Sequence, residues 1–261
     1  MVGIDLSGKR GVVLGVTNAR SLGWTIARKL HQAGCTLAMT YQNEKMRSDV
    51  DKLRPHLGDC PIYEVDVTHD DHLERLFAAI GKEWGGLDYI VHSVAFAPRA
   101  AMEGRYLDTR REDWLTALEV SAYSLAAVAK YAEPLLSKEG AIVTLSYDAA
   151  RRVVPRYNVM GIAKSALEAN VKYLAADLGE KGVRVNAISA GPMRTVAARS
   201  IPGFTYMYKH AANLAPLRRN VHHEEVGNLG LFLLSPLASG ITGEIMYVDA
   251  GYHIMSFRME D

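Results

Sequence analysis

A tyrosine and a lysine, Tyr157 and Lys164, form the pair whose chemistry and spacing suggest a reactive site in this sequence. If Pro155 takes the first turn of a helix, the two residues lie seven positions apart along it. At 100° per residue they return to almost the same face, separated by roughly 10 Å of rise. A phenol can donate a hydrogen bond or a proton to a developing oxyanion, and a nearby ammonium is expected to lower the pKa of the phenol. In isolation the pair is more simply explained by packing of the tyrosine and solvation of the lysine, so the surrounding fold must decide.

Short β-rich runs alternate with long helical runs along the chain. Strands are expected at residues 11–15, 36–41, 61–65, 87–91, 141–145, 183–188 and 244–248. Helices are expected at residues 21–32 and 44–57, and a third helix is expected to use Thr68 as its cap. Strands separated by helices of this length imply right-handed crossovers and a parallel sheet covered on both faces. The sequence therefore predicts a single α/β domain over residues 1–261, a Rossmann-type doubly wound parallel sheet of about seven strands.

The composition is that of an ordinary globular protein. Of the 261 residues, 49% are apolar and 23% are charged, and the net charge of +1 provides no overall field to attract nucleic acid. The amino terminus lacks the apolar core of a signal peptide, and the uncharged run 226–243 is broken by polar residues, proline and glycine. Cys35 and Cys60 lack a metal or redox spacing. We therefore expect a cytoplasmic protein without a nucleic-acid or membrane partner.

Histidine pairs offer weak metal candidates. His69 and His72 lie at an expected helix start, where the neighbouring acids suit the helix dipole, and both are expected to be exposed. His222 and His223 lie in a polar segment without an evident third ligand. No metal site is predicted.

The first expected strand ends at Gly15, and Ser21 opens the following helix with Gly23 in its first turn. Free backbone N–H groups and the helix dipole at this point suit a pyrophosphate, with Gly23 allowing close approach. The loop is longer than the G-x-G-x-x-G fingerprint, and alone it is a weak signal. Its position after the first strand favours phosphate binding over a simple strand boundary.

The end of the second strand is where a dinucleotide fold contacts the adenosine ribose. Gln42 stands there and can hydrogen-bond the ribose hydroxyls, whereas no cation directly occupies the place of a 2′-phosphate. NADH is therefore the predicted cofactor, although Lys45 and Arg47 are close enough to leave NADPH open. Asp66, after the third strand, is expected either to accept a hydrogen bond from adenine or to cap the next loop.

Two long connections, residues 92–109 and 189–224, leave the carboxyl ends of strands, where ligands bind in open α/β sheets. The second contains the apolar and aromatic segment 201–209. A lid over an apolar substrate would have this composition, and so would a contact between subunits. We predict a lid around residues 193–215.

The motifs around these positions resemble those of the short-chain dehydrogenase/reductases, specifically the divergent branch formed by the NADH-dependent enoyl-(acyl carrier protein) reductases. The resemblance covers essentially the whole chain, and it rests on the loop from Gly15 to Ser21 and on residues 92–98, 147–164, 186–195 and 243–244. The spacing from Tyr157 to Lys164 is its specific part. The commoner dehydrogenases of this superfamily carry tyrosine four residues before the lysine, where this chain has Met160.

This resemblance implies NADH-dependent reduction of the trans-2 double bond of enoyl-acyl-carrier-protein thioesters in type II fatty-acid biosynthesis. Tyr147, Tyr157 and Lys164 are the implied catalytic residues: Tyr157 stabilises the enolate oxygen, Lys164 holds the nicotinamide ribose and Tyr147 lines the acyl pocket. Implied cofactor contacts are Gly15, Ser21, Leu22, Gln42, Asp66, Val67, Ser93, Val94, Lys164, Met193, Thr195, Val196 and Ala197. Implied substrate contacts are Ala97, Tyr147, Tyr157, Met160, Ile201 and Phe204.

The resemblance also implies acyl-carrier protein as a partner and a homo-oligomer, a tetramer, as the assembly. Asp148 adds a carboxylate beside the pocket without an assigned role. Two other functions stay open: reduction of a carbonyl or of another unsaturated thioester, and nicotinamide binding without turnover. The presence of Tyr147, Tyr157 and Lys164 together favours an enzyme, and their spacing favours reduction of a carbon–carbon double bond.

Overall fold

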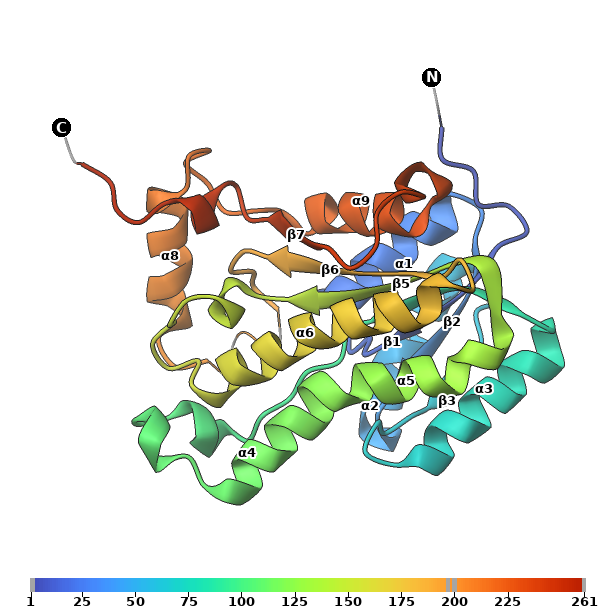
Figure 1. Ribbon diagram of the computed structural model, residues 1–261, viewed down its shortest axis with the longest axis horizontal. Helices are drawn as coiled ribbons and strands as arrows, with labels where there is room; N and C mark the ends of the chain where they lie inside the picture. The colour runs from blue at the N-terminus through green and yellow to red at the C-terminus, as the bar shows by residue number, and fades with distance from the viewer. Residues whose placement is uncertain (1–2, 196–197, 199–200, 260–261) are drawn as a thin grey trace.

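A seven-stranded parallel sheet forms the centre of the computed structural model, which describes residues 3–195, 198 and 201–259 (Figure 1). The strands are β1 (Arg10–Leu14), β2 (Thr36–Tyr41), β3 (Ile62–Glu64), β4 (Leu87–His92), β5 (Leu136–Ser146), β6 (Arg184–Ala190) and β7 (Ile245–Val248). They lie in the order β3-β2-β1-β4-β5-β6-β7, with every neighbouring pair parallel. The predicted α/β class and the seven predicted strands are confirmed. The strand order reverses between β1 and β4, where open sheets of this type bind ligands.

Helices cover both faces of the sheet (Figure 1). On one face α1 (Leu22–Gln32) and α9 (His223–Leu234) pack over a buried cluster that includes Val13 and Val91. On the other face α3 (Asp70–Trp84), α5 (Ser124–Ala132) and α6 (Val159–Gly179) cover a second cluster that includes Val12 and Ile90. Successive strand residues point to opposite faces, so strands covered on both sides are apolar throughout. This is why the central strands are short runs of valine, isoleucine and leucine.

The predicted helix over residues 44–57 is two elements in the structure. The helix α2 spans Glu44–Asp51, and a separate 3-10 helix spans Arg54–Leu57. Pro55 occupies the start of the 3-10 helix. Proline has no backbone N–H and clashes with the preceding turn, so a single α-helix does not continue through this point.

The predicted cap of α3 is wrong by one residue. The residue at the N-cap is His69, and the hydroxyl of Thr68 instead donates to Asp66 Oδ1 at 2.7 Å. The prediction that both histidines are exposed is also wrong for His72, because its Nδ1 accepts a hydrogen bond from the Asp66 N–H at 3.1 Å and its side chain is half-buried. A local loop contact has thus displaced the helix start.

Two further helices border the carboxyl edge of the sheet. Helix α4 (Arg111–Leu118) joins α5 through a π turn at Glu119–Tyr123, and α8 (Phe204–Leu214) follows β6. Helix α8 stands beside the ends of β5 and β6, away from the layers that cover the sheet (Figure 1). Across the residues that the structure describes, no helix has both the length and the hydropathy needed to cross a bilayer.

Candidate active site

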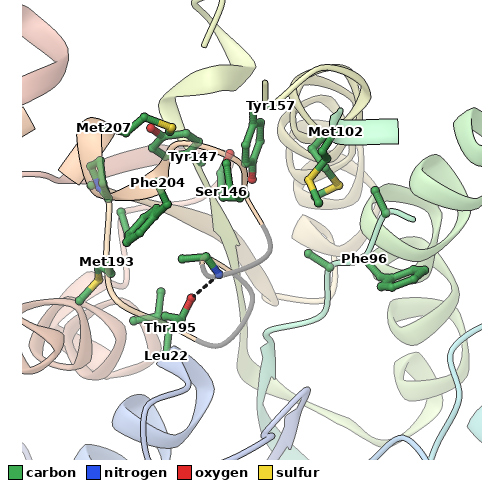
Figure 2. Close-up of a pocket in the computed structure, with 18 of the residues that line it drawn as sticks. Leu22, Phe96, Met102, Ser146, Tyr147, Tyr157, Met193, Thr195, Phe204 and Met207 are labelled. Carbon is green, nitrogen blue, oxygen red and sulfur yellow. Dashed lines mark hydrogen bonds between the residues drawn. The ribbon is translucent and has the colours of Figure 1, made fainter. Parts of the chain in front are cut away.

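A cavity of about 280 Å³ lies at the carboxyl edge of the sheet, between the loop after β4 and the helix α8 (Figure 2). All six predicted substrate residues line it: Ala97, Tyr147, Tyr157, Met160, Ile201 and Phe204. Three of the predicted cofactor residues, Leu22, Met193 and Thr195, line it as well. Residues that are up to 185 positions apart in the sequence therefore meet around one space.

The wall of this cavity is mostly apolar, and it includes three residues that the sequence did not predict: Met102, Ser146 and Met207. Met102 and Met207 face the space from opposite sides, and Ser146 lies beneath the two tyrosines (Figure 2). Methionine is flexible and fits irregular apolar surfaces, so this lining suits a linear hydrocarbon chain. Met102 lies in the long connection after β4 and Met207 in the one after β6. This position was the one feature of the sequence that could have indicated that they line the cavity.

The predicted helical setting of Tyr157 is wrong. The helix α6 begins only at Val159, and Tyr157 lies in the turn before it. On either side Arg156 and Asn158 have φ angles of 65° and 39°, in the left-handed region that non-glycine residues rarely adopt. These two angles keep α6 from beginning before Val159, so Pro155 does not start the helix.

The two tyrosines meet edge to face, with ring centroids 5.1 Å apart and an interplanar angle of 63°. Tyr157 points into the middle of the cavity, whereas the ring of Tyr147 lies on the side of Met207 (Figure 2). Burial raises the pKa of Tyr157, and burial together with the Tyr252 and Tyr157 hydroxyls raises the pKa of Tyr147. The expectation that Lys164 lowers the pKa of Tyr157 is therefore wrong. A protonated Tyr157 is the form that donates a hydrogen bond, so the corrected direction still suits an oxyanion contact.

Lys164 is buried in α6 and lies outside the lining of the cavity. Its Nζ donates to the backbone oxygen of Leu145 at 2.7 Å. Burial lowers the pKa of Lys164 to about 8, and the nearby Glu168 carboxylate opposes this shift. Glu168 in turn accepts a hydrogen bond from Ser146 Oγ at 2.7 Å. The ammonium is thus held beside the end of β5, next to the serine that lines the cavity.

The remaining predicted cofactor residues follow the carboxyl ends of successive strands. Gly15 follows β1, Gln42 follows β2, Asp66 and Val67 follow β3, and Ser93 and Val94 follow β4. Because parallel strands end at one edge of the sheet, these positions form a row that leads towards the cavity. Val196 and Ala197 lie outside the described residues. Thr195 is described, and its Oγ1 accepts a hydrogen bond from the N–H of Ala198 at 3.1 Å (Figure 2).

Within the described residues, backbone donors of the first turn of α1 have no partner at this edge. Ser21 is the N-cap residue but makes no side-chain cap, and its hydroxyl donates to Asn18 O at 2.8 Å. The first turn carries no acidic side chain. Amides without helical partners and an uncompensated dipole are favourable for an anion. Gly23 was expected to let the anion approach closely. A Cβ added at Gly23 would lie 3.0 Å from the Cβ of Ser93, its nearest neighbour in the structure.

Gly15 is required by the backbone of the loop. Its φ is +83°, and an added Cβ would lie 2.1 Å from the backbone oxygen of Ser93. We expect Gly15→Ala to destabilise the protein by about 3 kcal/mol, from the left-handed conformation together with the clash. Urea denaturation at one protein concentration measures this loss. Gly8→Ala is the matched control, because Gly8 has a φ of +77° but, apart from its chain neighbours, no atom of the described residues within 4 Å of the added carbon, and about 1 kcal/mol is expected there. Equal losses in the two variants would contradict the assigned role of the Ser93 contact.

Asp66 has the loop-capping role that was one of its two expected roles. Its Oδ1 accepts from the N–H and the hydroxyl of Thr68 at 3.0 and 2.7 Å, and its Oδ2 lies 3.4 Å from Gln42 Nε2. The hydrogen bonds from Thr68 and Gln42 outweigh burial and lower the pKa of the Asp66 carboxyl, although burial is the largest single influence. Gln42 and Asp66 are thus neighbours at the ends of β2 and β3.

In the described part of the chain, no group of three or more histidine, cysteine, aspartate or glutamate side chains is arranged to hold a metal ion.

Comparison with known proteins identifies the family. The family model described as enoyl-(acyl carrier protein) reductase matches residues 15–253. The chain belongs to the enoyl-(acyl carrier protein) reductase family. The enoyl-(acyl carrier protein) reductase (NADH) 1 of Rhizobium meliloti is 46% identical, over 98% of this chain and 94% of its own. The corresponding NADH enzyme of Neisseria meningitidis is 48% identical, over 98% of each chain.

Solved structures of this family have the same fold over nearly the full length. The enoyl-(acyl carrier protein) reductase of Anaplasma phagocytophilum, in complex with NAD, has a TM-score of 0.95 at 44% identity and covers 99% of both chains. The Bacillus cereus enzyme, with NADP+ and an indole naphthyridinone, has a TM-score of 0.95 at 45% identity and covers 98% of this chain and 100% of its own. The resemblance expected from the Tyr157 and Lys164 spacing is therefore confirmed.

Proposed function

We propose that the protein is an enoyl-(acyl carrier protein) reductase that uses NADH to reduce the trans-2 double bond of enoyl thioesters in type II fatty-acid biosynthesis. The observation that carries this proposal is the cavity in which Tyr147, Tyr157 and Met160 meet Thr195 and Phe204 at the edge where the sheet order reverses. An apolar space with a buried phenol suits a long acyl chain that ends in a thioester. Family membership and the NADH-dependent relatives support the same reaction.

The residues of the edge fit a dinucleotide. The amides of the first turn of α1 suit its pyrophosphate, and Gly15 lets the loop after β1 pack closely against the backbone of Ser93 at this edge. Gln42 lies where the adenosine ribose is held in this fold, whereas Arg47 pairs with Glu44 and lies over the ring of Tyr41. The arrangement of these four side chains favours NADH over NADPH.

In the proposed reaction Tyr157 acts on the substrate and Lys164 acts on the cofactor. Bound NADH would supply the hydride that adds to the β-carbon of the enoyl group, and a proton from solvent would then add to the α-carbon to complete the saturated thioester. Negative charge then gathers on the thioester oxygen, where the Tyr157 hydroxyl donates a hydrogen bond to the enolate. Lys164 holds the nicotinamide ribose with the donors that it does not use on Leu145. Tyr147 packs against the Tyr157 ring and contacts the acyl group.

Residues 193–215 are the proposed lid. Helix α8 in this segment contributes Phe204 and Met207 to the cavity, and Gly203 starts it in a left-handed conformation. Acyl-carrier protein would deliver the substrate, and Arg218 and Arg219, which follow this segment, are candidates to meet its acidic surface. The predicted homotetramer rests on the family resemblance, and the predicted cytoplasmic location rests on composition and cysteine usage; both stay predictions.

A spectrophotometric assay tests the reaction. NADH absorbance at fixed enzyme is followed with crotonyl-CoA or a longer 2-enoyl thioester, and then with a 3-oxoacyl thioester of the same length. We expect oxidation of NADH with the enoyl thioesters only. Oxidation with the ketone alone would contradict the proposal, and a parallel assay with NADPH measures the cofactor preference.

The pKa of Lys164 predicts how NADH binding depends on pH. Its pKa of about 8 in the free protein means that the ammonium is present at pH 7 and largely lost at pH 9.5. Since the charged form is the stronger donor to ribose hydroxyls, the Kd for NADH is expected to rise as the pH passes upward through about 8. Fluorescence titration of NADH at pH 7, 8 and 9.5 measures this. A Kd that is the same across this range would remove the ammonium from the cofactor site.

A further inference from the structure

The π turn at Glu119–Tyr123 places a buried serine behind the cavity. A π turn contains one residue more than an α turn, so it interrupts the regular hydrogen bonds of a helix, and it is found often at functional sites. Side chains bind two backbone oxygens of this turn: Ser124 Oγ donates to Val120 O at 2.6 Å, and Asn170 Nδ2 donates to Ala122 O at 2.9 Å. Asn170 belongs to α6. The turn is therefore fixed against the helix that follows Tyr157.

Ser121 lies in the middle of this turn, fully buried, and binds both backbone polar groups of Phe96. Its Oγ accepts a hydrogen bond from the Phe96 N–H and donates one to the Phe96 oxygen, each at 2.9 Å. Within residues 3–195, 198 and 201–259, the backbone of residues 94–97 makes no other hydrogen bond. The Phe96 side chain is 54% exposed and gives the loop little anchorage. Ser121 is thus the polar anchor of this loop.

The same hydroxyl reaches a second wall of the cavity. Ser121 Oγ lies 3.7 Å from the sulfur of Met160 in α6. Ala95 and Ala97, on either side of Phe96, line the cavity, and Met160 lines it as well. Ser121 itself does not line it. One buried side chain therefore connects the loop after β4 to α6 from behind.

We propose that Ser121 is a positioning residue that sets the distance between the loop at 95–97 and Met160, and so determines how tightly the enoyl thioester is held. The inference rests on the proposed function, because it takes the cavity to be the acyl site. Ser121 acts through Phe96 and Met160, without touching the substrate. A loop freed from this serine widens the space for the acyl group but leaves Tyr157 and Lys164 in place.

The test compares Ser121→Ala with Ser235→Ala. Ser235 is the matched control because it is also fully buried and its Oγ also donates to a backbone oxygen, that of Phe232 at 2.8 Å, but it does not line the cavity. In Ser121→Ala we expect the KM for a 2-enoyl thioester to rise about tenfold, with kcat lowered by no more than about threefold and the Kd for NADH within about twofold. Ser235→Ala is expected to leave all three constants within about twofold. Ser121→Cys keeps the size of the side chain with weaker hydrogen bonding, and an intermediate rise of about threefold in KM is expected.

A measurement that does not use turnover accompanies the kinetics. Hydrogen exchange of the Phe96 amide is expected to be at least about tenfold faster in Ser121→Ala than in the unchanged protein, because its acceptor is lost. A folded Ser121→Ala with an unchanged KM, or with a fall in kcat alone, would overturn the proposal, as would an equal rise in KM in Ser235→Ala. If Ser121→Ala does not fold, Ser121→Cys decides by the same criteria. If the protein without substitutions fails to oxidise NADH with every enoyl thioester tested, the proposed function is refuted instead. The hydrogen exchange of the Phe96 amide would still show whether Ser121 anchors the loop.

Discussion

Tyr157→Phe is expected to lower kcat for a 2-enoyl thioester by about 100-fold or more. The substitution removes one hydrogen bond to the developing enolate oxygen, and a single oxyanion donor contributes about 3 kcal/mol at the transition state. Burial raises the pKa of this hydroxyl, so it is protonated and able to donate over the whole range from pH 6 to 9. The ring stays in its contact with Tyr147, so the fold and the Kd for NADH are expected to change little.

Steady-state kinetics with NADH and the enoyl thioester measure this effect, and calorimetry reports the melting temperature. Tyr173→Phe is the matched control, because Tyr173 lies on α6 and its side chain is 76% exposed. Its kinetic constants are expected to equal those of the unchanged protein. A Tyr157→Phe variant with full activity would remove Tyr157 from the oxyanion and leave Tyr147 as the next candidate.

Lys164→Met is expected to weaken NADH binding by about 30- to 100-fold. Hydrogen bonds from a charged donor contribute about 1.5–3 kcal/mol, and the ribose hydroxyls would lose theirs. The effect on stability should be small or in the opposite direction. The lowered pKa of Lys164 shows that burial disfavours its charge more than Glu168 favours it, and methionine fills a similar volume without that charge.

Isothermal titration with NADH and a thermal melt of the same sample separate the two effects. Lys172→Met is the control, because Lys172 lies eight residues further along α6 with an exposed side chain. Lys164→Met with unchanged NADH affinity would contradict the ribose role. A strongly lowered melting temperature would show instead that the bond from Nζ to Leu145 O stabilises the fold.

The sequence was most informative where burial acts on a whole element. The valine- and isoleucine-rich strands β1, β4 and β5 can fit only a sheet covered on both faces, so their number and parallel direction followed from the pattern. Boundaries failed where a local contact competes with helix formation. His69 stands at the N-cap of α3 in place of Thr68, whose hydroxyl donates to Asp66, and Pro55 divides the helix expected after β2.

The six predicted substrate residues line one cavity, but the direction of the pKa shift at Tyr157 was not predicted correctly. The spacing of Tyr157 and Lys164 indicated these two residues. The pKa of each group depends mainly on its burial, and burial depends on how distant segments of the chain pack. The only signal for Met102 and Met207 was their position in the two long connections, and Ser121 had none, because each acquires its place from elements far along the chain. Family resemblance supplied the roles that neither spacing nor composition contains.

The turn that holds Tyr157 allows the position of its phenol to change independently of Lys164. Since α6 begins at Val159, the phenol and the ammonium are carried by separate pieces of backbone: Lys164 moves with the helix, and Tyr157 moves with a turn whose φ angles depart from the helical range at Arg156 and Asn158. An insertion or deletion in this turn would shift the phenol by several ångströms and leave the register of the helix intact. The distance between the two groups is therefore adjustable by loop length alone, which offers a simple route by which one scaffold acquires substrates whose reactive oxygen lies at a different depth.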